Sequence, residues 1–235
     1  SMNGTTIFDA GADTAAFDGL LVSQGSTADI TTPGALRFVR GPAAYAASYD
    51  ANGNMTSRCV EGKAYLLAWD WENRLTEIRQ GSDVSTFVYD GDSKRVKATV
   101  GAATTYYVGN YYEVKNGVAT SYYYHWGHRV AMRTGGARTY LLGDQLGSTS
   151  ASYRSDGGAT ATQRYYPWGN VRSTTGTMPT DYAFNGKQVD AGSGLLYYGA
   201  RWYDATAARW IQPDTIVPNP GNPQDLNRYS YCRNN

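Results

Sequence analysis

The 235-residue chain is poor in cysteine and in charge, and each shortage excludes a class of protein. Two cysteines, Cys59 and Cys232, are too few for a disulfide scaffold and form no CxxC motif, so free thiols are expected, with their pairing left open. Charged residues make up 17% of the chain, against about 25% in an average globular protein. The 21 Lys and Arg nearly balance the 20 Asp and Glu, which argues against a nucleic-acid partner.

Long apolar runs are also missing. No stretch approaches the roughly 18 consecutive apolar residues of a transmembrane helix, and no basic segment followed by an apolar run opens the chain. These patterns predict a soluble chain with no signal peptide and no membrane insertion. Ser1-Met2 resembles the remnant of a cleaved tag, and Arg233-Asn234-Asn235 stops in mid-pattern, so we expect an excised fragment.

Motifs for common catalytic and metal chemistry are absent as well. The sequence has no Gly-rich phosphate loop, no G-x-S-x-G and no Ser-His-Asp spacing. The two histidines, His125 and His128, lie in a strand-like segment, where side chains three residues apart point to opposite faces. No Cys or nearby Glu completes a ligand set. The sequence therefore predicts no metal site and no cofactor.

What the chain does contain is 21 Tyr, 6 Trp and 27 Gly. Tyr and Trp favour strands and Gly marks tight turns, so the composition predicts an all-β protein. The first 45 residues carry short apolar pieces that indicate two or three strands of uncertain pairing.

A repeat begins at Tyr49. Each unit opens with an aromatic residue and an Asp, passes a residue suited to positive φ, and resumes an apolar or β-branched run. The period is 20 residues, as shown by Tyr49-Asp50-Ala51-Asn52-Gly53, Trp69-Asp70-Trp71-Glu72-Asn73 and Tyr89-Asp90-Gly91-Asp92-Ser93. Such a unit predicts a β-hairpin.

Two details of the hairpin can be predicted. Asn52-Gly53 favours a primed turn with both central residues at positive φ. The Asp of each unit can accept hydrogen bonds from backbone amides a few residues on, so a mechanical role is favoured over a catalytic one.

The aromatic strands continue after the repeats. Glycine-bearing turns at Gly101, Gly109-Asn110, Asn116-Gly117 and Gly135-Gly136 separate them, and a single short helix is expected within residues 223–228. Stacked hairpins of this kind predict a curved, spiralling, open antiparallel sheet with little helix. Its open edges predict a homo-oligomer for the isolated fragment.

The units and several later motifs resemble the RHS (rearrangement hot spot) or YD-repeat family of polymorphic toxins, toxin-complex subunits and teneurins. Residues 46–138 resemble its YD-repeat hairpins, and residues 139–235 resemble its repeat-associated core domain, truncated at the C-terminus. The core motifs are Tyr140-Leu141-Leu142-Gly143-Asp144-Gln145-Leu146-Gly147-Ser148, Tyr166-Pro167-Trp168-Gly169, Phe184-Asn185-Gly186-Lys187-Gln188, Gly194–Asp204, Arg209-Trp210-Ile211-Gln212-Pro213-Asp214 and Asn227–Asn235.

The resemblance implies a hollow β-shell that encloses or presents a C-terminal effector segment, in a parent that is secreted or displayed at the cell surface. It also implies an aspartic autoprotease in some members, with Asp214 and Arg209 at matching positions. Here Asp214 is followed by Thr215-Ile216-Val217 instead of the family's Pro-x-Gly, and the second Asp is not in the chain. A non-enzymatic scaffold is therefore the expected function, and a remnant of the autoprotease is an alternative.

The aromatic surplus supports a further alternative, a glycan or cell-surface adhesion module. Exposed Tyr and Trp rings bind sugar faces well. The direction in which four side chains point distinguishes an adhesion module from a shell. A cluster on the solvent side would favour adhesion, and a cluster on the concave face would favour the shell. The four side chains are those of Tyr106, Tyr122, Tyr124 and Trp126.

Overall fold

The computed structural model describes residues 45–158 and 160–232. Fourteen strands form one antiparallel sheet in strict chain order, so every strand pairs with its sequence neighbours. The strands are β1 (Tyr45–Tyr49), β2 (Met55–Val60), β3 (Lys63–Trp69), β4 (Leu75–Gln80), β5 (Asp83–Tyr89), β6 (Arg95–Val100), β7 (Ala103–Val108), β8 (Tyr112–Lys115), β9 (Val118–His125), β10 (His128–Thr134), β11 (Ala137–Gly143), β12 (Thr149–Arg154), β13 (Ala161–Tyr165) and β14 (Val171–Thr175).

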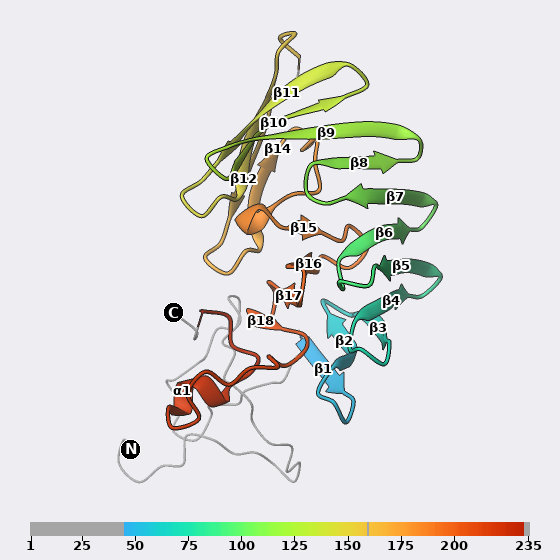
Figure 1. Ribbon diagram of the computed structural model, residues 1–235, viewed down its shortest axis with the longest axis vertical. Coiled ribbons are helices and arrows are strands. Elements are labelled where there is room, and N and C mark those ends of the chain that lie inside the picture. Colours follow the sequence, from blue (N-terminus) through green and yellow to red (C-terminus); the bar gives the residue numbers. More distant parts are fainter. Residues whose placement is uncertain (1–44, 159, 233–235) are drawn as a thin grey trace, which may run out of the picture. The chain divides into compact units, whose positions relative to one another are not determined.

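The sheet coils along its length, so that β12 and β14 run in a different direction from β5 and β7 (Figure 1). Four short strands form a second antiparallel sheet: β15 (Gln188–Val189), β16 (Leu196–Tyr197), β17 (Trp202–Asp204) and β18 (Arg209–Trp210). Within the described residues, helix is confined to η1 (Phe184–Gly186) and α1 (Pro223–Leu226). The prediction of an open, curved, all-β sheet with little helix is confirmed, and α1 is the short helix expected within residues 223–228, whereas η1 was not expected.

Burial follows the 20-residue period of the sequence. Strands β2, β4 and β6 bury their first and fourth residues, and β3 and β5 bury their third and fifth. The corresponding core positions are Met55, Leu75 and Arg95 in one row and Arg58, Ile78 and Ala98 in another. The 20-residue period therefore places equivalent residues at equivalent inward-facing positions, and the core lies on one face of the sheet.

The turn after each aromatic-Asp pair differs from the predicted primed turn. In the first unit Gly53 has a positive φ of 84°, whereas Asn52 does not have a positive φ. The residues equivalent to Gly53 in the next two units, Asn73 and Ser93, also have positive φ, at 59° and 58°. The backbone amide of Gly53 donates to the Asp50 carbonyl, and the register shifts by one residue next to each turn. One left-handed residue beside a β-bulge closes this loop, so the prediction of two positive-φ residues at Asn52-Gly53 is wrong.

Primed turns occur instead at the opposite ends of the hairpins. Glu61-Gly62, Asn116-Gly117 and Trp126-Gly127 each have two successive positive φ values. Each pair joins two strands directly, as the pairing of Val60 with Lys63 shows. A two-residue connection needs this backbone twist, whereas the longer Asp turn does not.

The Asp that recurs in each unit acts on its own turn. Asp70 Oδ1 accepts hydrogen bonds from the backbone amides of Glu72 (3.0 Å) and Arg74 (2.9 Å), and Asp90 Oδ1 does the same for Asp92 and Lys94. Asp144 repeats the arrangement with Leu146 and Ser148. Asp144 therefore opens a fourth turn of this type, which the 20-residue spacing alone does not reveal.

Removing one of these carboxylates should weaken the sheet locally. We expect Asp70→Ala to lower the free energy of unfolding by about 1–2 kcal/mol, because it removes two amide acceptors and the ion pair with Arg74 (2.7 Å). Partial burial acts to raise the pKa of Asp70, but the hydrogen bonds from Arg74 outweigh it and hold the pKa below its ordinary value of 3.8. The difference between wild type and variant should thus be full above pH 4 and shrink as the pH falls further.

Urea unfolding at pH 7 and pH 3 measures this difference. Asp92→Ala is the matched control, because Asp92 is exposed and only its backbone amide takes part in the turn. A variant at position 70 that is as stable as the control would contradict the mechanical role.

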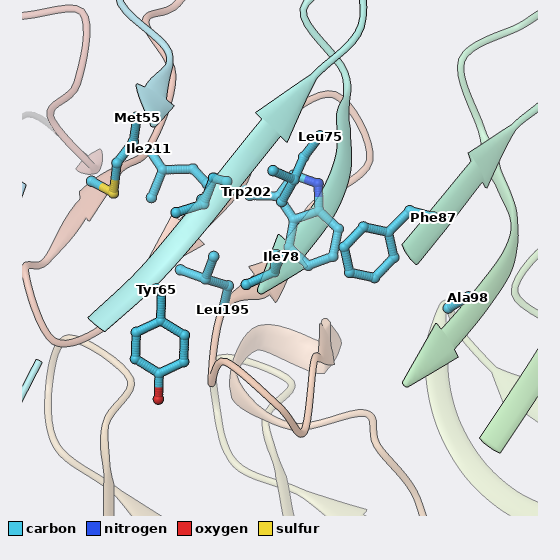
Figure 2. Packing of buried hydrophobic residues seen from close by; sticks show 10 residues of the cluster. Met55, Tyr65, Leu75, Ile78, Phe87, Ala98, Leu195, Trp202 and Ile211 are labelled. Carbon is cyan, nitrogen blue, oxygen red and sulfur yellow. The ribbon is translucent and has the colours of Figure 1, made fainter. Parts of the chain in front are cut away.

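The core lies between the large sheet and the segment that contains β15–β18. Ten buried residues form its main cluster, and they come from both layers: Met55, Tyr65, Leu67, Leu75, Ile78, Phe87, Ala98, Leu195, Trp202 and Ile211. Figure 2 shows the Trp202 indole beside the Phe87 ring, with Leu75 and Ile78 close by. The C-terminal segment is therefore built into the inner face of the hairpins.

Residues 1–44 and 233–235 lie outside the described residues, and so do the strands predicted for the first 45 residues, apart from Tyr45 at the start of β1. Among the described residues no helix is long and apolar enough to cross a bilayer.

Candidate functional site

Buried polar contacts join the inner face of the large sheet to the C-terminal layer that contains β15–β18, and we call this interface the seam. Its centre is the ion pair of Arg58 on β2 with Asp204 on β17, at 2.5 Å from Nη1 to Oδ2, with both side chains only 2% exposed. Tyr45 donates its hydroxyl to the same carboxylate oxygen, and the backbone amide of Thr206 donates to the other. Arg58 also donates to the backbone carbonyl of Ser193. These contacts fasten residues near 200 to the first hairpin.

A second arginine crosses the seam without a carboxylate. Arg95 on β6 is buried and lies over four aromatic rings, those of Phe87, Tyr107, Tyr197 and Trp202, at 4.4 to 5.6 Å from each centroid. Its guanidinium donates to the side-chain carbonyl of Gln188 on β15. The negative faces of the rings stabilise the buried charge, as in other cation–π contacts.

A third arginine occupies a similar place farther along the sheet. The Arg129 guanidinium lies 3.2 Å from the Tyr182 ring centroid and is flanked by the rings of Tyr122 and Tyr124. Beside it, Tyr122 donates its hydroxyl to Glu113 at 2.9 Å. Burial raises the pKa of Glu113, although the hydrogen bond from Tyr122 acts in the opposite direction.

This raised pKa predicts that Glu113→Gln makes the chain more stable at neutral pH. The neutral form of Glu113 is favoured by folding, so its stabilising contribution is full below pH 4.5 and is lost as the pH rises through the raised value. Glutamine keeps an acceptor for Tyr122 and carries no charge to bury. The advantage of the variant in thermal unfolding should therefore grow as the pH rises above about 4.5 and stay constant above the raised pKa.

Glu77→Gln, in the more exposed pair with Arg79, is the control and should show no such growth. A Glu113→Gln variant that is less stable than wild type at pH 8 would contradict the assignment.

The seam joins two layers of the same polypeptide. Among the described residues no group of three or more His, Cys, Asp and Glu could hold a metal ion. His125 ends β9 and His128 begins β10, and the two face each other across the Trp126-Gly127 turn, so the expectation that they share one strand is wrong. Cys59 and Cys232 are both free thiols. A cavity of about 160 Å³ is lined by Tyr65, Ile78, Gln80, Asp83, Val84, Ser85, Val100, Gly101 and Gly192.

The two residues singled out by the autoprotease pattern lie in separate contacts. Asp214 pairs with Arg201 at 2.8 Å and accepts a hydrogen bond from the backbone amide of Ile216. Arg209 instead lies over the Tyr229 ring. Asp214 is thus an ion-paired carboxylate in a turn, with Arg201 and not Arg209 as its partner.

The four aromatic side chains proposed as a ligand surface do not form one surface. Tyr122 is buried and packs against Tyr182, and Tyr124 contacts Arg129 on the same inner face. Tyr106 is 54% exposed and alternates with the buried Thr105, so it lies on the outer face, and Trp126 is 88% exposed in a turn. The adhesion surface formed by these four residues is therefore not present.

Sequence reasoning missed Arg58, Arg95, Arg129 and Asp204. A signal for the first two was available, because the 20-residue frame places each arginine where the other units have Leu, Met, Ile or Ala. A charged residue at a core position of a repeat indicates a contact outside that repeat. No comparable signal marks Arg129, which lies beyond the regular units.

Residues 104–235 match the family model described as Teneurin YD-shell. The chain belongs to the teneurin YD-shell family. This confirms the resemblance to RHS and YD-repeat proteins that the motifs indicated.

Relatives of this YD-shell chain include bacterial and animal proteins. The tRNA nuclease WapA of Bacillus subtilis (strain 168) is 30% identical over 203 residues, which cover 80% of this chain and 8% of WapA. Toxin subunit YenC1 of Yersinia entomophaga is 32% identical over 41% of this chain, and Teneurin-1 of Gallus gallus is 29% identical over 80% of it. The YD-shell chain spans about a tenth or less of the length of these relatives.

Solved structures show the same fold. The crystal structure of TcdB2-TccC3 matches with a TM-score of 0.65 at 21% identity and covers 79% of this YD-shell chain and 10% of that chain. The crystal structure of TcdB2-TccC3-Cdc42 matches with a TM-score of 0.64 at 22% identity.

Proposed function

We propose that this chain is a non-enzymatic segment of a YD shell that encloses or presents a C-terminal effector segment of its own parent protein. In this proposal residues 46–138 supply hairpin wall and residues 139–235 the repeat-associated core domain. The observation that carries the proposal is the seam, where the inner face of the sheet holds later polypeptide through Arg58, Arg95 and Arg129. A sheet whose inner face already binds a later segment of its own chain is suited to binding a further segment there.

The non-enzymatic part rests on the surroundings of Asp214. A catalytic carboxylate pair needs two acids that share a proton, so that one is neutral while the other activates water. Asp214 instead forms an ion pair with Arg201 at 2.8 Å and accepts a hydrogen bond from the backbone amide of Ile216. This arrangement supports a structural carboxylate over the remnant of an aspartic autoprotease.

Likeness to toxin subunits supports a parent that is secreted or displayed at the cell surface. The effector is then the partner that the shell would keep apart from the producing cell until delivery. Of the two alternatives, glycan adhesion lacks the surface first assigned to it, and the ion pair of Asp214 with Arg201 argues against the autoprotease.

Limited proteolysis of the natural full-length parent tests the enclosure. We expect the segment that follows residue 235 to resist trypsin for much longer than the same segment made as a free peptide. Asp204→Asn should open the seam and restore cleavage. Equal cleavage rates for the enclosed segment and the free peptide would overturn the proposal.

The intact mass of the same parent tests the non-enzymatic part. We expect a single species after long incubation. A specific cut that disappears in Asp214→Asn would show autoproteolysis instead.

The open edges of the sheet predict self-association of the isolated chain. Among the described strands β14 pairs with β13 alone, and all five of its residues are exposed. An edge of this kind presents unpaired backbone donors and acceptors to a second copy. We expect light scattering of the 235-residue chain to show a dimer or a larger species whose mass rises with concentration. A strictly monomeric chain at high concentration would contradict this.

A further inference from the structure

The outer face of β8–β12 carries two arginines without partners among exposed tyrosines. Arg133 on β10 lies directly opposite Arg138 on β11, and both side chains are exposed. Their facing is fixed by their neighbours, because Met132 belongs to the inner cluster with Tyr122 and Leu141, and strand side chains alternate. The two guanidinium groups therefore lie on the solvent side, away from the seam.

No counter-ion is provided by the described part of the chain. Its ion pairs include neither Arg133 nor Arg138, and no hydrogen bond of either guanidinium is found there. Like charges directly opposite each other on a sheet are destabilising, with Cβ atoms about 4.5–5.5 Å apart. A pair of this geometry is suited to one anion held between two guanidinium forks.

Tyrosine rings border the arginine pair on the same face. The register places Tyr112 and Ser121 in the row of Arg133, and it aligns Tyr123, Ala131, Tyr140 and Tyr153 in the adjacent row. The four tyrosines are 38 to 49% exposed. Ala131 is buried between Tyr123 and Tyr140 although it faces outward, so the rings stand above it on both sides.

We propose that this surface, the Arg133–Arg138 pair with Tyr112, Tyr123, Tyr140 and Tyr153, binds an acidic polysaccharide. The arginine pair would hold a carboxylate or sulfate group of one sugar, and the flat tyrosine rings would stack on neighbouring sugars. The inference goes beyond enclosure of an effector, because it concerns the face opposite the seam.

Other polyanions fit less well. Binding to nucleic acid draws on a series of phosphate contacts, whereas this face offers one cation pair and the whole chain has a net charge of +1. An acidic peptide would favour a groove or a free strand edge, but β9–β11 are paired on both sides and present a face. Charge and ring placement together favour an anionic sugar polymer.

Binding of purified polysaccharides to the 235-residue chain tests the proposal. The probes are heparin, polygalacturonate and neutral dextran, with single-stranded oligothymidylate and poly-glutamate as competing classes. Calorimetry at two salt concentrations should show binding to heparin or polygalacturonate, weakened by salt, and none to dextran.

The double variant Arg133→Gln/Arg138→Gln should lose about tenfold or more in affinity. Arg164→Gln/Arg172→Gln is the matched control, because it removes the same charge from exposed positions on β13 and β14 and should stay within about twofold. Tyr140→Ala should weaken binding by about tenfold. Unchanged thermal unfolding of each variant shows that the fold is kept.

Three results would overturn the proposal. They are the absence of binding to both acidic polysaccharides, equal losses in the two double variants, and tighter arginine-dependent binding of the oligonucleotide or the acidic peptide.

Discussion

Asp204→Asn should lower the free energy of unfolding by about 3–5 kcal/mol, the usual cost of removing one partner from a buried ion pair. Asparagine has nearly the shape of aspartate, so packing is retained while the Arg58 guanidinium loses its counter-charge at a site that is 2% exposed. The Tyr45 hydroxyl loses a charged acceptor in the same step. Chemical denaturation followed by tryptophan fluorescence measures the change.

Asp181→Asn is the matched control for this experiment. Asp181 forms an ion pair with Lys115 at 3.0 Å, but both side chains are about half exposed. A pair of this kind contributes about 0–1 kcal/mol. Similar losses for the two variants would show that Arg58 and Asp204 are no more than a surface-like contact.

Trp202→Ala should cost about 3–5 kcal/mol, because it removes the largest side chain of the core and leaves a cavity between the two layers. Trp202 is 1% exposed, and its ring lies 4.7 Å from Phe87 and 5.1 Å from Tyr197 between centroids. Its indole N–H also donates to the Tyr89 hydroxyl. Arg95 would lose one of its four aromatic neighbours.

Trp126→Ala provides the control, since that indole is 88% exposed in a turn and should change stability by less than about 0.5 kcal/mol. Trp202→Phe should lie between wild type and Trp202→Ala. If Trp202→Ala unfolds at the same denaturant concentration as the control, the C-terminal layer does not pack on the hairpins as described.

Local features of this fold could be predicted from the sequence because they depend on local chemistry. The aromatic-Asp units identified hairpins, since an Asp carboxylate and a left-handed residue close a turn with groups a few positions apart. The turn at Asn52-Gly53 was predicted wrongly because an Asn-Gly dipeptide suits both a two-residue primed turn and the longer Asp turn. The longer turn forms here, and in it the Asp50 carboxylate accepts a hydrogen bond from the backbone amide of Asn54 at 2.8 Å.

The seam could not be predicted in the same way. Arg58 and Asp204 are 146 positions apart, and Arg95 and Gln188 are 93 apart, so no local pattern pairs them. The positions of Tyr106, Tyr122, Tyr124 and Trp126 could not be predicted from local patterns either. Alternation along a strand separates Tyr106 from Tyr122 and Tyr124 only when the register of the intervening strands is known.

Strict chain order within the sheet has a consequence for how the protein is made. Each strand finds its partner in the strand that was synthesised just before it, so loop closure costs little and hairpins can form while the ribosome is still translating. The seam needs residues near 200, so it closes only after the wall exists. Until then Arg58 and Arg95 lack the partners that Asp204 and Gln188 later provide.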